Sequence, residues 1–167
     1  MEDNGEESAK SSWTPHRTIT GRIVHVALAS ESPHTKTKRT AVQQKGLRYE
    51  KKIVRELKRV MPNKVFHGQW LRYQDASGKH YAQPDLYTVF PDRVLLFECK
   101  LTQNDGARPQ CLSLYAPLLT ELYSLPVISC QVFHNLRYVP ENGLIKSWGQ
   151  LLSLPIGFYN WHNIGET

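Results

Sequence analysis

Three charged residues in the middle of the chain have the types and the spacing to hold a divalent cation beside an ammonium group. Asp85 follows Pro84, and after twelve further residues the chain reads Glu98-Cys99-Lys100. Because side chains alternate along a strand, Glu98 and Lys100 share one face and Cys99 points to the other. One role for Glu98 and Lys100 is an ion pair at the exposed end of the strand. The other is catalytic: Asp85 and Glu98 hold a divalent cation, and the ammonium group acts on an attacking water.

Two further polar residues are placed to join such a site. Glu50 lies one helical turn from Leu47, on the apolar side of an expected helix, so it points toward the core. An acid in that position belongs either to a buried pair or to a metal centre, as a third carboxylate. Gln110 lies in the first turn of a second expected helix, where it is either an ordinary helix-start residue or reaches the strand ends. His67 and His80 are further candidates for the walls of the cleft.

The elements that must position these residues follow from the hydrophobic periodicity. Apolar residues recur every three or four positions over 43–60 and again over about 107–124, which predicts two helices, the second kinked at Pro117. A weak helix is expected over 143–154, followed by an aromatic tail that packs on the body. The order α-β-β-β-α-β predicts an α/β sandwich, in which helices flank a mixed central β-sheet. Branched and aromatic runs predict strands over 65–73, 86–90, 94–101 and 127–134.

With these elements in place, the chain resembles the PD-(D/E)XK nuclease superfamily over about residues 43–134. The resemblance implies a restriction-endonuclease-like fold and a metal-dependent phosphodiesterase. It also implies that Glu50 supports a second metal or its water shell, and that Gln110 positions the water or the phosphate. Tyr115 follows Gln110 one residue later than in the family branch with a Gln-Tyr helical signature, so it is not counted as a site residue. The residues that carry the resemblance are Glu50, Pro84-Asp85, Glu98-x-Lys100 and Gln110.

The central roles implied by the resemblance concern the metal and the water. Asp85 and Glu98 hold Mg²⁺ or Mn²⁺, together with the backbone carbonyl of Cys99. Lys100 orients or deprotonates the attacking water and stabilises the charge that develops on the phosphate. This chemistry is physically sound, because a cation between carboxylates lowers the pKa of bound water and offsets the negative charge of the phosphate.

Basic residues are concentrated in one part of the chain. Eleven of the 21 Lys and Arg residues lie within residues 36–64, against two acids, although the whole chain has a net charge of only +6. Such a stripe indicates a polyanionic partner, here DNA, and the alternative is a solvated helix face. The residues expected to contact nucleic acid are Lys45, Arg48, Lys51, Lys52, Arg55, Lys58 and Arg59.

A flexible arm and basic linker are expected over residues 1–42, with the nuclease domain over 43–167. Residues 19–29 form either a short strand or an arm. An arm suits an intertwined homodimer, because symmetric cutting of two strands needs two sites. The preferred function is a structure-selective or low-specificity endonuclease, similar to a phage-type Holliday-junction resolvase or a VRR-NUC enzyme. A duplex-end exonuclease and a non-catalytic nucleic-acid-binding module stay open as alternatives.

Composition and motifs argue against several other classes of protein. The length of 167 residues fits one domain. There is no Gly-rich loop ending in Gly-Lys-Ser/Thr, so no nucleotide cofactor is expected. No apolar run approaches the roughly 20 residues of a membrane span, and the acidic start does not resemble a secretory signal. The three cysteines are widely spaced, so the expected compartment is a reducing cytoplasm, bacterial or of a phage-infected host cell.

Overall fold

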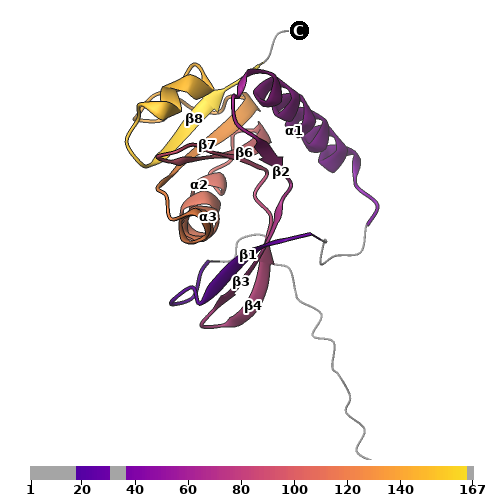
Figure 1. Cartoon of the computed structure of the whole chain (residues 1–167). Coiled ribbons are helices and arrows are strands. Elements are labelled where there is room, and N and C mark those ends of the chain that lie inside the picture. The colour runs from indigo at the N-terminus through magenta and orange to yellow at the C-terminus, as the bar shows by residue number, and fades with distance from the viewer. Residues whose placement is uncertain (1–17, 31–36, 165–167) are drawn as a thin grey trace, which may run out of the picture.

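The computed structural model describes residues 18–30 and 37–164, which form two β-sheets and the helices packed on them (Figure 1). None of the helices in these two ranges is long and apolar enough to cross a membrane. The strands are β1 (His25–Ala29), β2 (Val65–His67), β3 (Trp70–Asp75), β4 (Gly78–Ala82), β5 (Leu86–Val89), β6 (Val94–Thr102), β7 (Val127–Asn135) and β8 (Phe158–His162). The helical elements are α1 (Ala41–Val60), α2 (Ala107–Gln110), the π-helical turn η1 (Cys111–Tyr115), α3 (Ala116–Tyr123) and the 3₁₀ turn η2 (Trp148–Leu152).

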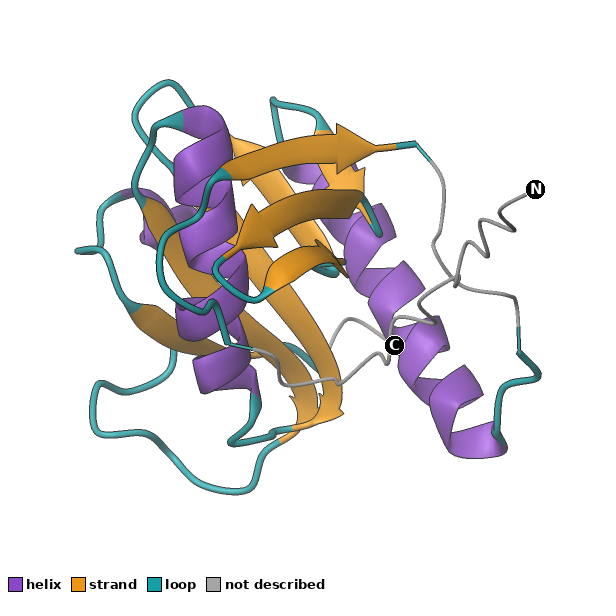
Figure 2. Ribbon diagram, turned by 90° about the horizontal axis from the view of Figure 1, so that it is seen from below, coloured by secondary structure: helices purple, strands orange, loops and turns teal. Residues whose placement is uncertain are grey.

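A mixed five-stranded sheet, in the order β2-β5-β6-β7-β8, forms the centre of the molecule. β5 is antiparallel to β2 and β6, whereas β6, β7 and β8 run parallel to one another. Helical layers lie on both sides of the strands (Figure 2). One core joins α1 to the sheet through Ile53, Leu57 and Phe97, and the other joins α3 to it through Leu96 and Leu118. The predicted α/β sandwich, with a mixed central sheet flanked by helices, is therefore confirmed.

The first predicted helix is confirmed, although it begins at Ala41 rather than at residue 43. Thr40 and Gln43 form a capping box at its start. The Thr40 hydroxyl accepts a hydrogen bond from the main-chain N–H of Gln43 at 3.2 Å, and the Gln43 side-chain oxygen accepts one from the N–H of Thr40 at 2.9 Å. This cap satisfies two helix-end donors, so the helix begins before the hydrophobic repeat does. The side of α1 that faces the sheet buries Tyr49, Ile53, Val54 and Leu57.

The single strand predicted over 65–73 is wrong, because Gly68 interrupts it. Gly68 has a φ of +60°, a left-handed conformation that glycine adopts at little cost. The chain turns there, so β2 joins the central sheet while β3 joins a second sheet in the order β1-β3-β4. The N–H of Gly68 donates to the Asp85 carbonyl at 2.9 Å, and the Gln83 side-chain amide donates to the Gly68 carbonyl at 2.7 Å. The turn is thereby tied to the segment that carries Asp85.

Part of the predicted flexible arm is an ordered strand. Residues 1–17 and 31–36 lie outside the described residues, but β1 pairs antiparallel with β3 of the same chain. Val26 of β1 also packs against the core on the α3 side. α1 likewise begins inside the range 1–42 that was predicted to be arm and linker. β4, which was not predicted, pairs with the other side of β3 and completes this smaller sheet.

The C-terminal region departs further from the predicted elements. Only η2 is helical within the helix predicted over 143–154, because Ile145 forms a bridge to Trp161 at the edge of β8. The aromatic tail packs on the body as predicted, but it does so as β8, a strand parallel to β7. The helix predicted over about 107–124 is present as α2, η1 and α3 in succession, with Pro117 at the start of α3. The structure of the C-terminal region depends on pairing between strands that are far apart in the sequence. Local periodicity does not predict such pairing.

Asp75 fixes the hairpin between β3 and β4. Its carboxylate is buried and accepts hydrogen bonds from the N–H of Thr20 at 2.9 Å, the N–H of Ser77 at 2.9 Å and the Ser77 hydroxyl at 2.6 Å. Burial by itself raises the pKa of Asp75, but these hydrogen bonds and the nearby His80 lower it to about 2. Because this value lies below the ordinary pKa of 3.8, the ionised carboxylate stabilises the fold at pH values above 3.8. The stabilisation is lost as the pH falls toward about 2.

Asp75→Asn is expected to lower the free energy of unfolding by about 1–2 kcal/mol near neutral pH. Urea denaturation at a series of pH values measures the effect. The difference from the wild type should shrink as the pH falls, because the wild-type carboxylate then becomes protonated. Asp92→Asn, at an exposed turn, is the control and should change stability little at any pH. A difference for Asp75→Asn that stays constant down to acidic pH would contradict this account.

Candidate active site

Glu50, Asp85 and Lys100, three of the residues predicted to do chemistry, line one cleft of about 930 Å³ between α1, the turn after β2 and the end of β6, whereas Gln110 does not line it. The cleft brings together residues that are far apart in the sequence, because α1 packs across the strands that carry the others. Glu98 lies beneath the cleft wall, paired with Lys100. The lining includes Glu50, His67, Gln83, Asp85, Cys99, Lys100 and Asn104.

Asp85 stands immediately before β5 and is held by the neighbouring strand. Its Oδ2 accepts a hydrogen bond from the main-chain N–H of Cys99 on β6 at 2.8 Å. The predicted hairpin is present, with Leu86 opposite Phe97, so Asp85 lies beside Glu98. Burial raises the pKa of Asp85 well above its usual range, and the negative charges of Glu98 and Glu50 raise it further. A nearby cation would relieve this cost.

Glu98 and Lys100 form the ion pair that their spacing allows, but the pair is not at an exposed strand end. Glu98 is only 2% exposed, and its Oε1 accepts a hydrogen bond from Lys100 Nζ at 3.0 Å. The other oxygen, Oε2, is buried and has no hydrogen-bond partner among the described residues. Burial lowers the pKa of Lys100, but the carboxylates of Glu98 and Asp85 outweigh it and raise the pKa above its usual value. Lys100 is therefore a charged ammonium group at the cleft wall.

Glu50 points from α1 into the same cleft, and its direct partner is a histidine. Glu50 Oε1 lies 2.8 Å from His67 Nε2 on β2. Its negative charge raises the pKa of both Asp85 and Glu98, so the three carboxylates act on one another electrostatically. His67 thus lines the cleft, as one of the two candidate histidines. His80 does not, because it contacts Ser77 in the hairpin between β3 and β4.

Gln110 is joined to Tyr115, although the spacing of the two residues predicts no site role for Tyr115. The Gln110 side-chain amide donates a hydrogen bond to the Tyr115 hydroxyl at 2.7 Å. In an α-helix, residues five positions apart lie on different sides, but the π-helical turn η1 brings them one turn apart. Tyr115 is buried, and its pKa is raised by burial and by the charges of Glu98 and Asp85. The extra residue in the spacing is therefore absorbed by the backbone, and Tyr115 lies beside the site.

The donor atoms of the cleft suit some metals and not others. Within the described ranges, no group of three or more His, Cys, Asp or Glu side chains is arranged to hold a metal ion. Two carboxylates remain, the partly buried Asp85 and the buried Glu98, and the latter has the partnerless Oε2. Mg²⁺ is usually bound by one or two carboxylates and keeps several waters. The residues present therefore fit Mg²⁺ or Mn²⁺ with a large water shell, and they do not fit a cage built from many side chains.

The main chain and the side chain of Cys99 have different roles. Its main-chain N–H fixes Asp85, as described above. Its thiol points away from Glu98 and Lys100 into the core on the α1 side, as the alternation along the strand predicts. The backbone carbonyl of Cys99 stays a predicted metal ligand. The thiol is buried, and burial together with the charges of Asp85 and Glu50 raises its pKa well above the usual value, which disfavours the thiolate.

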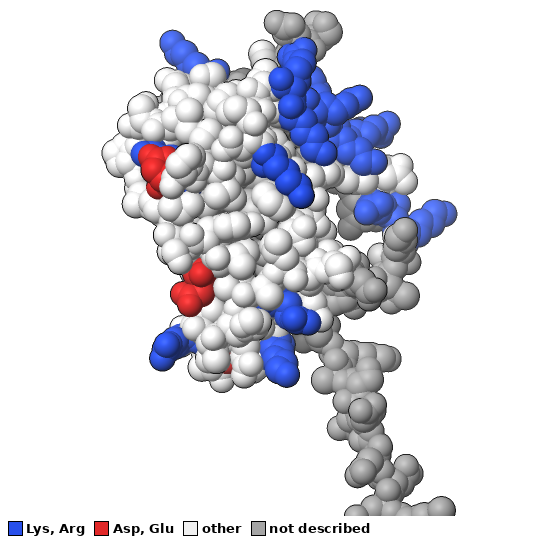
Figure 3. Space-filling view, in the orientation of Figure 1, with Lys and Arg blue, Asp and Glu red and all other residues white. Residues whose placement is uncertain are grey.

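The basic residues of α1 lie on the side turned away from the sheet. Figure 3 shows the Lys and Arg side chains gathered over this helix. Lys52 is the exception, because it is partly buried and donates a hydrogen bond to the Ile164 carbonyl at 3.4 Å. The same helix carries Glu50 into the cleft, so the basic surface borders the candidate active site. We refer to this surface as the basic stripe; its exposed members are Lys45, Arg48, Lys51, Arg55, Lys58 and Arg59.

Three polar residues around the cleft were not predicted. Gln83 holds the turn at Gly68, and Asn104 lines the cleft after the end of β6. Gln131 lies on β7 directly opposite Glu98, and its side-chain oxygen accepts a hydrogen bond from the N–H of Asn104 at 2.6 Å. An amide side chain inside an apolar strand is a signal that would have pointed to Gln131, because a buried amide needs partners.

Comparison with known proteins assigns this chain to no family. No family model matches it, and no curated protein matches it. Among solved structures, it is similar to the crystal structure of protein VC1899 from Vibrio cholerae, at 18% sequence identity and a TM-score of 0.41. The match covers 66% of this chain and 28% of that one, so the chain spans little more than a quarter of that protein. A likeness of this strength supports no conclusion about function.

Proposed function

We propose that this protein is a metal-dependent nuclease that hydrolyses phosphodiester bonds in DNA. The observation that carries the proposal is that Asp85 and Lys100 line one cleft together with Glu50, which comes from a separate helix, while Glu98 lies beneath the cleft wall and is paired with Lys100. A buried carboxylate with a partnerless oxygen beside a second, partly buried carboxylate is costly, and such sites are more often functional than structural. The resemblance to PD-(D/E)XK nucleases supports the same proposal, because it falls on these four positions.

Each residue has a distinct task in the proposed reaction. Asp85 and Glu98 would hold Mg²⁺ or Mn²⁺ with the backbone carbonyl of Cys99, and the bound ion would act as a Lewis acid and lower the pKa of a water. Lys100 orients the attacking water and stabilises the negative charge that develops on the phosphate. Glu98 holds Lys100 in place through the 3.0 Å ion pair. The water oxygen forms the new bond to phosphorus and gives up a proton to solvent, while the bond to the leaving sugar oxygen breaks and that oxygen takes up a proton from solvent.

Glu50 and Gln110 support this centre from the two helical layers. Glu50 is held by His67. In the proposed reaction it would bind the water shell of the ion or a second ion. Gln110 uses its amide nitrogen for Tyr115, so its side-chain oxygen is left to accept a hydrogen bond from a water. These are positioning roles, and smaller losses are expected from their removal than from the removal of Lys100.

The proposal is tested by incubating the protein with supercoiled plasmid, a four-way junction and linear duplex in Mg²⁺, Mn²⁺ or EDTA. We expect cleavage in Mg²⁺ and Mn²⁺ and none in EDTA. Nicking or linearisation of the plasmid supports an endonuclease, and preference for the junction supports a resolvase that acts as a homodimer. Loss of the linear duplex alone supports an exonuclease. Binding without cleavage under all conditions overturns the nuclease proposal in favour of a binding module.

The basic stripe is expected to bind the DNA backbone and to make binding sensitive to salt. Each Lys or Arg that neutralises a phosphate contributes about one unit to the slope of log affinity against log salt concentration. We therefore expect the double variant Lys51→Ala/Arg55→Ala to weaken binding to a short duplex in EDTA by about tenfold and to flatten the slope. Arg137→Ala, an exposed residue outside the stripe, is the control. Equal slopes for the wild type and the double variant would contradict this role for the stripe.

The hydrogen bond between Gln110 and Tyr115 is expected to matter for turnover and not for folding. Tyr115→Phe removes the oxygen that fixes the Gln110 amide, and we expect the cleavage rate to fall by about tenfold, which corresponds to about 1.4 kcal/mol. Tyr123→Phe is a matched control, because its hydroxyl also forms a tyrosine hydrogen bond, at 2.8 Å to Tyr87. Equal losses of rate in the two variants would show that the effect is structural.

A further inference from the structure

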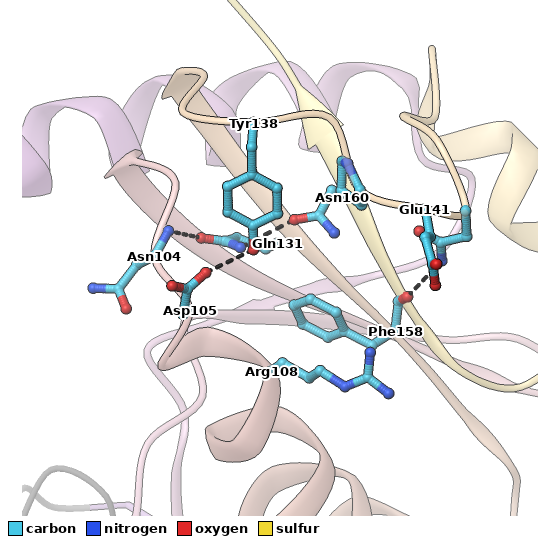
Figure 4. Close-up of a pocket in the computed structure, with 10 residues that line it drawn as sticks. Asn104, Asp105, Arg108, Gln131, Tyr138, Glu141, Phe158 and Asn160 are labelled. Carbon is cyan, nitrogen blue, oxygen red and sulfur yellow. Dashed lines mark hydrogen bonds between the residues drawn. The ribbon is translucent and has the colours of Figure 1, made fainter.

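A second pocket, of about 480 Å³, adjoins the cleft and has no task in the chemistry above. It lies beside β7 and β8, between the start of α2 and the loop that follows β7 (Figure 4). Asn104 lines both the pocket and the cleft. Glu98, Gln131 and Asn160 lie in one row across β6, β7 and β8. Two strand spacings place Asn160 about 10 Å from Glu98, so the pocket is next to the proposed reaction centre.

The walls of this pocket are held by hydrogen bonds. The Gln103 side-chain oxygen accepts from the N–H of Tyr138 at 3.0 Å, which anchors the start of the loop. The Tyr138 hydroxyl donates to Asp105 at 2.6 Å, and the Asn142 side-chain amide donates to the Phe158 carbonyl at 3.2 Å. These contacts tie the loop to α2 on one side and to β8 on the other (Figure 4). The pocket is therefore formed before any ligand binds.

Three polar groups in the pocket have no partner within the described part of the chain. Asn160 is 6% exposed; its side-chain oxygen accepts from the Gln131 amide at 3.1 Å, which leaves the Nδ2 group turned into the pocket (Figure 4). Arg108 and Glu141 line the same pocket, and neither side chain makes an ion pair or hydrogen bond with a described residue. The Nδ2 group of Asn160 is therefore an unused hydrogen-bond donor at the pocket wall. The pocket thus presents a donor, a cation and a carboxylate beside the Phe158 ring.

We propose that this pocket holds one unpaired base of the DNA strand, next to the phosphate that is cut. This inference rests on the proposed nuclease function. A base is a flat ring with hydrogen-bonding groups along its edge, which matches an aromatic side chain surrounded by polar groups. Asn160 Nδ2 donates to an acceptor on the base, Glu141 accepts from an exocyclic amine, and Arg108 contacts the neighbouring phosphate. Thymine lacks the exocyclic amine, so it is the least favoured base.

The proposed occupant also determines which DNA structures are substrates. A base inside a duplex is stacked, and its pairing edge is occupied, so it enters a pocket only when it is unpaired or extruded. Unpaired nucleotides occur at branches, bulges, mismatches and single-stranded ends. The pocket therefore supports structure selectivity, and it assigns that selectivity to particular residues.

Binding to the pocket is tested without any cleavage. Two-dimensional amide NMR spectra of the full chain in EDTA are recorded during titration with dCMP, dAMP, dTMP or inorganic phosphate. We expect saturable shifts in the side-chain amide signals of Asn160 and Gln131, with dTMP binding at least about tenfold more weakly than dCMP. Shifts that are equal for all nucleotides and for inorganic phosphate, or that are confined to the basic stripe, overturn the proposal.

Variants assign the contacts. Asn160→Asp keeps the oxygen that accepts from Gln131 and replaces the free donor, so dCMP binding should fall by at least about tenfold. Arg108→Ala and Glu141→Gln change exposed residues and keep the test valid if the buried variant does not fold. Arg108→Ala should weaken the binding of every nucleotide. Glu141→Gln should reduce the preference for dCMP over dTMP. Arg137→Ala is the charge-matched control. Unchanged binding in both exposed variants overturns the proposal.

Cleavage of duplexes that carry one unpaired nucleotide separates this inference from the proposed function. We expect cuts within about two nucleotides of the unpaired base and rates at least about tenfold lower on fully paired duplex. Pocket binding of dCMP without any cleavage would overturn the nuclease function and leave the binding site. Metal-dependent cleavage that is indifferent to unpaired bases and to Glu141→Gln would overturn the pocket and leave the nuclease function.

Discussion

Lys100→Ala is expected to lower the rate of metal-dependent DNA cleavage by at least about 10³-fold. The ammonium group lies at the cleft wall, held 3.0 Å from Glu98 Oε1. In the proposed reaction it would contact both the attacking water and the charge that develops on the phosphate. A neutral methyl group does neither task. Measurement of cleavage rates at saturating DNA and Mg²⁺ separates this loss from a loss of binding.

Two further variants make the Lys100 result interpretable. Lys79→Ala removes the same charge from an exposed position on β4 and should leave the rate within about twofold of the wild type. Lys100→Arg keeps the charge but not the compact ammonium group, so it should recover only part of the activity. Because removal of one partner of a buried ion pair is destabilising, thermal unfolding must show that each variant is folded at the assay temperature. Wild-type rates for Lys100→Ala would refute the role of this residue.

Asp85→Asn is expected to abolish cleavage and, at the same time, to stabilise the protein in EDTA. Asparagine keeps an oxygen that can accept the hydrogen bond from the N–H of Cys99, now 2.8 Å in length. The substitution removes the negative charge that is repelled by Glu98 and Glu50. We expect the free energy of unfolding in EDTA to rise by about 1 kcal/mol, as occurs where function maintains a destabilising charge.

Metal binding then distinguishes the two proteins in thermal unfolding. A cation that binds only the folded state stabilises that state, and the stabilisation grows with the ratio of the cation concentration to its dissociation constant. Added Mg²⁺ should therefore raise the unfolding temperature of the wild type and leave that of Asp85→Asn almost unchanged. Asp92→Asn, at an exposed turn, is the control and should respond to Mg²⁺ as the wild type does. This account would be contradicted if Asp85→Asn were less stable than the wild type in EDTA. It would also be contradicted if Mg²⁺ raised the unfolding temperature of the variant as much as that of the wild type.

Local rules were sufficient for the elements that carry the candidate site. The helical repeat of apolar residues placed Glu50 on the inner side of α1, and the alternation of a strand placed Glu98 and Lys100 together, with the Cys99 thiol opposite. The hairpin of β5 and β6 brought Asp85 beside them. Each of these features depends on residues a few positions apart, and periodicities of 3.6 and 2 describe such residues well.

Tertiary structure alone decided how these elements meet and what surrounds them. The positive φ of Gly68 sends β2 and β3 to different sheets, and no hydrophobic pattern records the conformation of one glycine. The π-helical turn brings Tyr115 to Gln110 although their spacing argues against contact. The parallel pairing of β7 with β8 places Gln131 beside Asn160 and so creates the second pocket. Partners in such pairings are distant in sequence, and only the packing of the whole chain selects them.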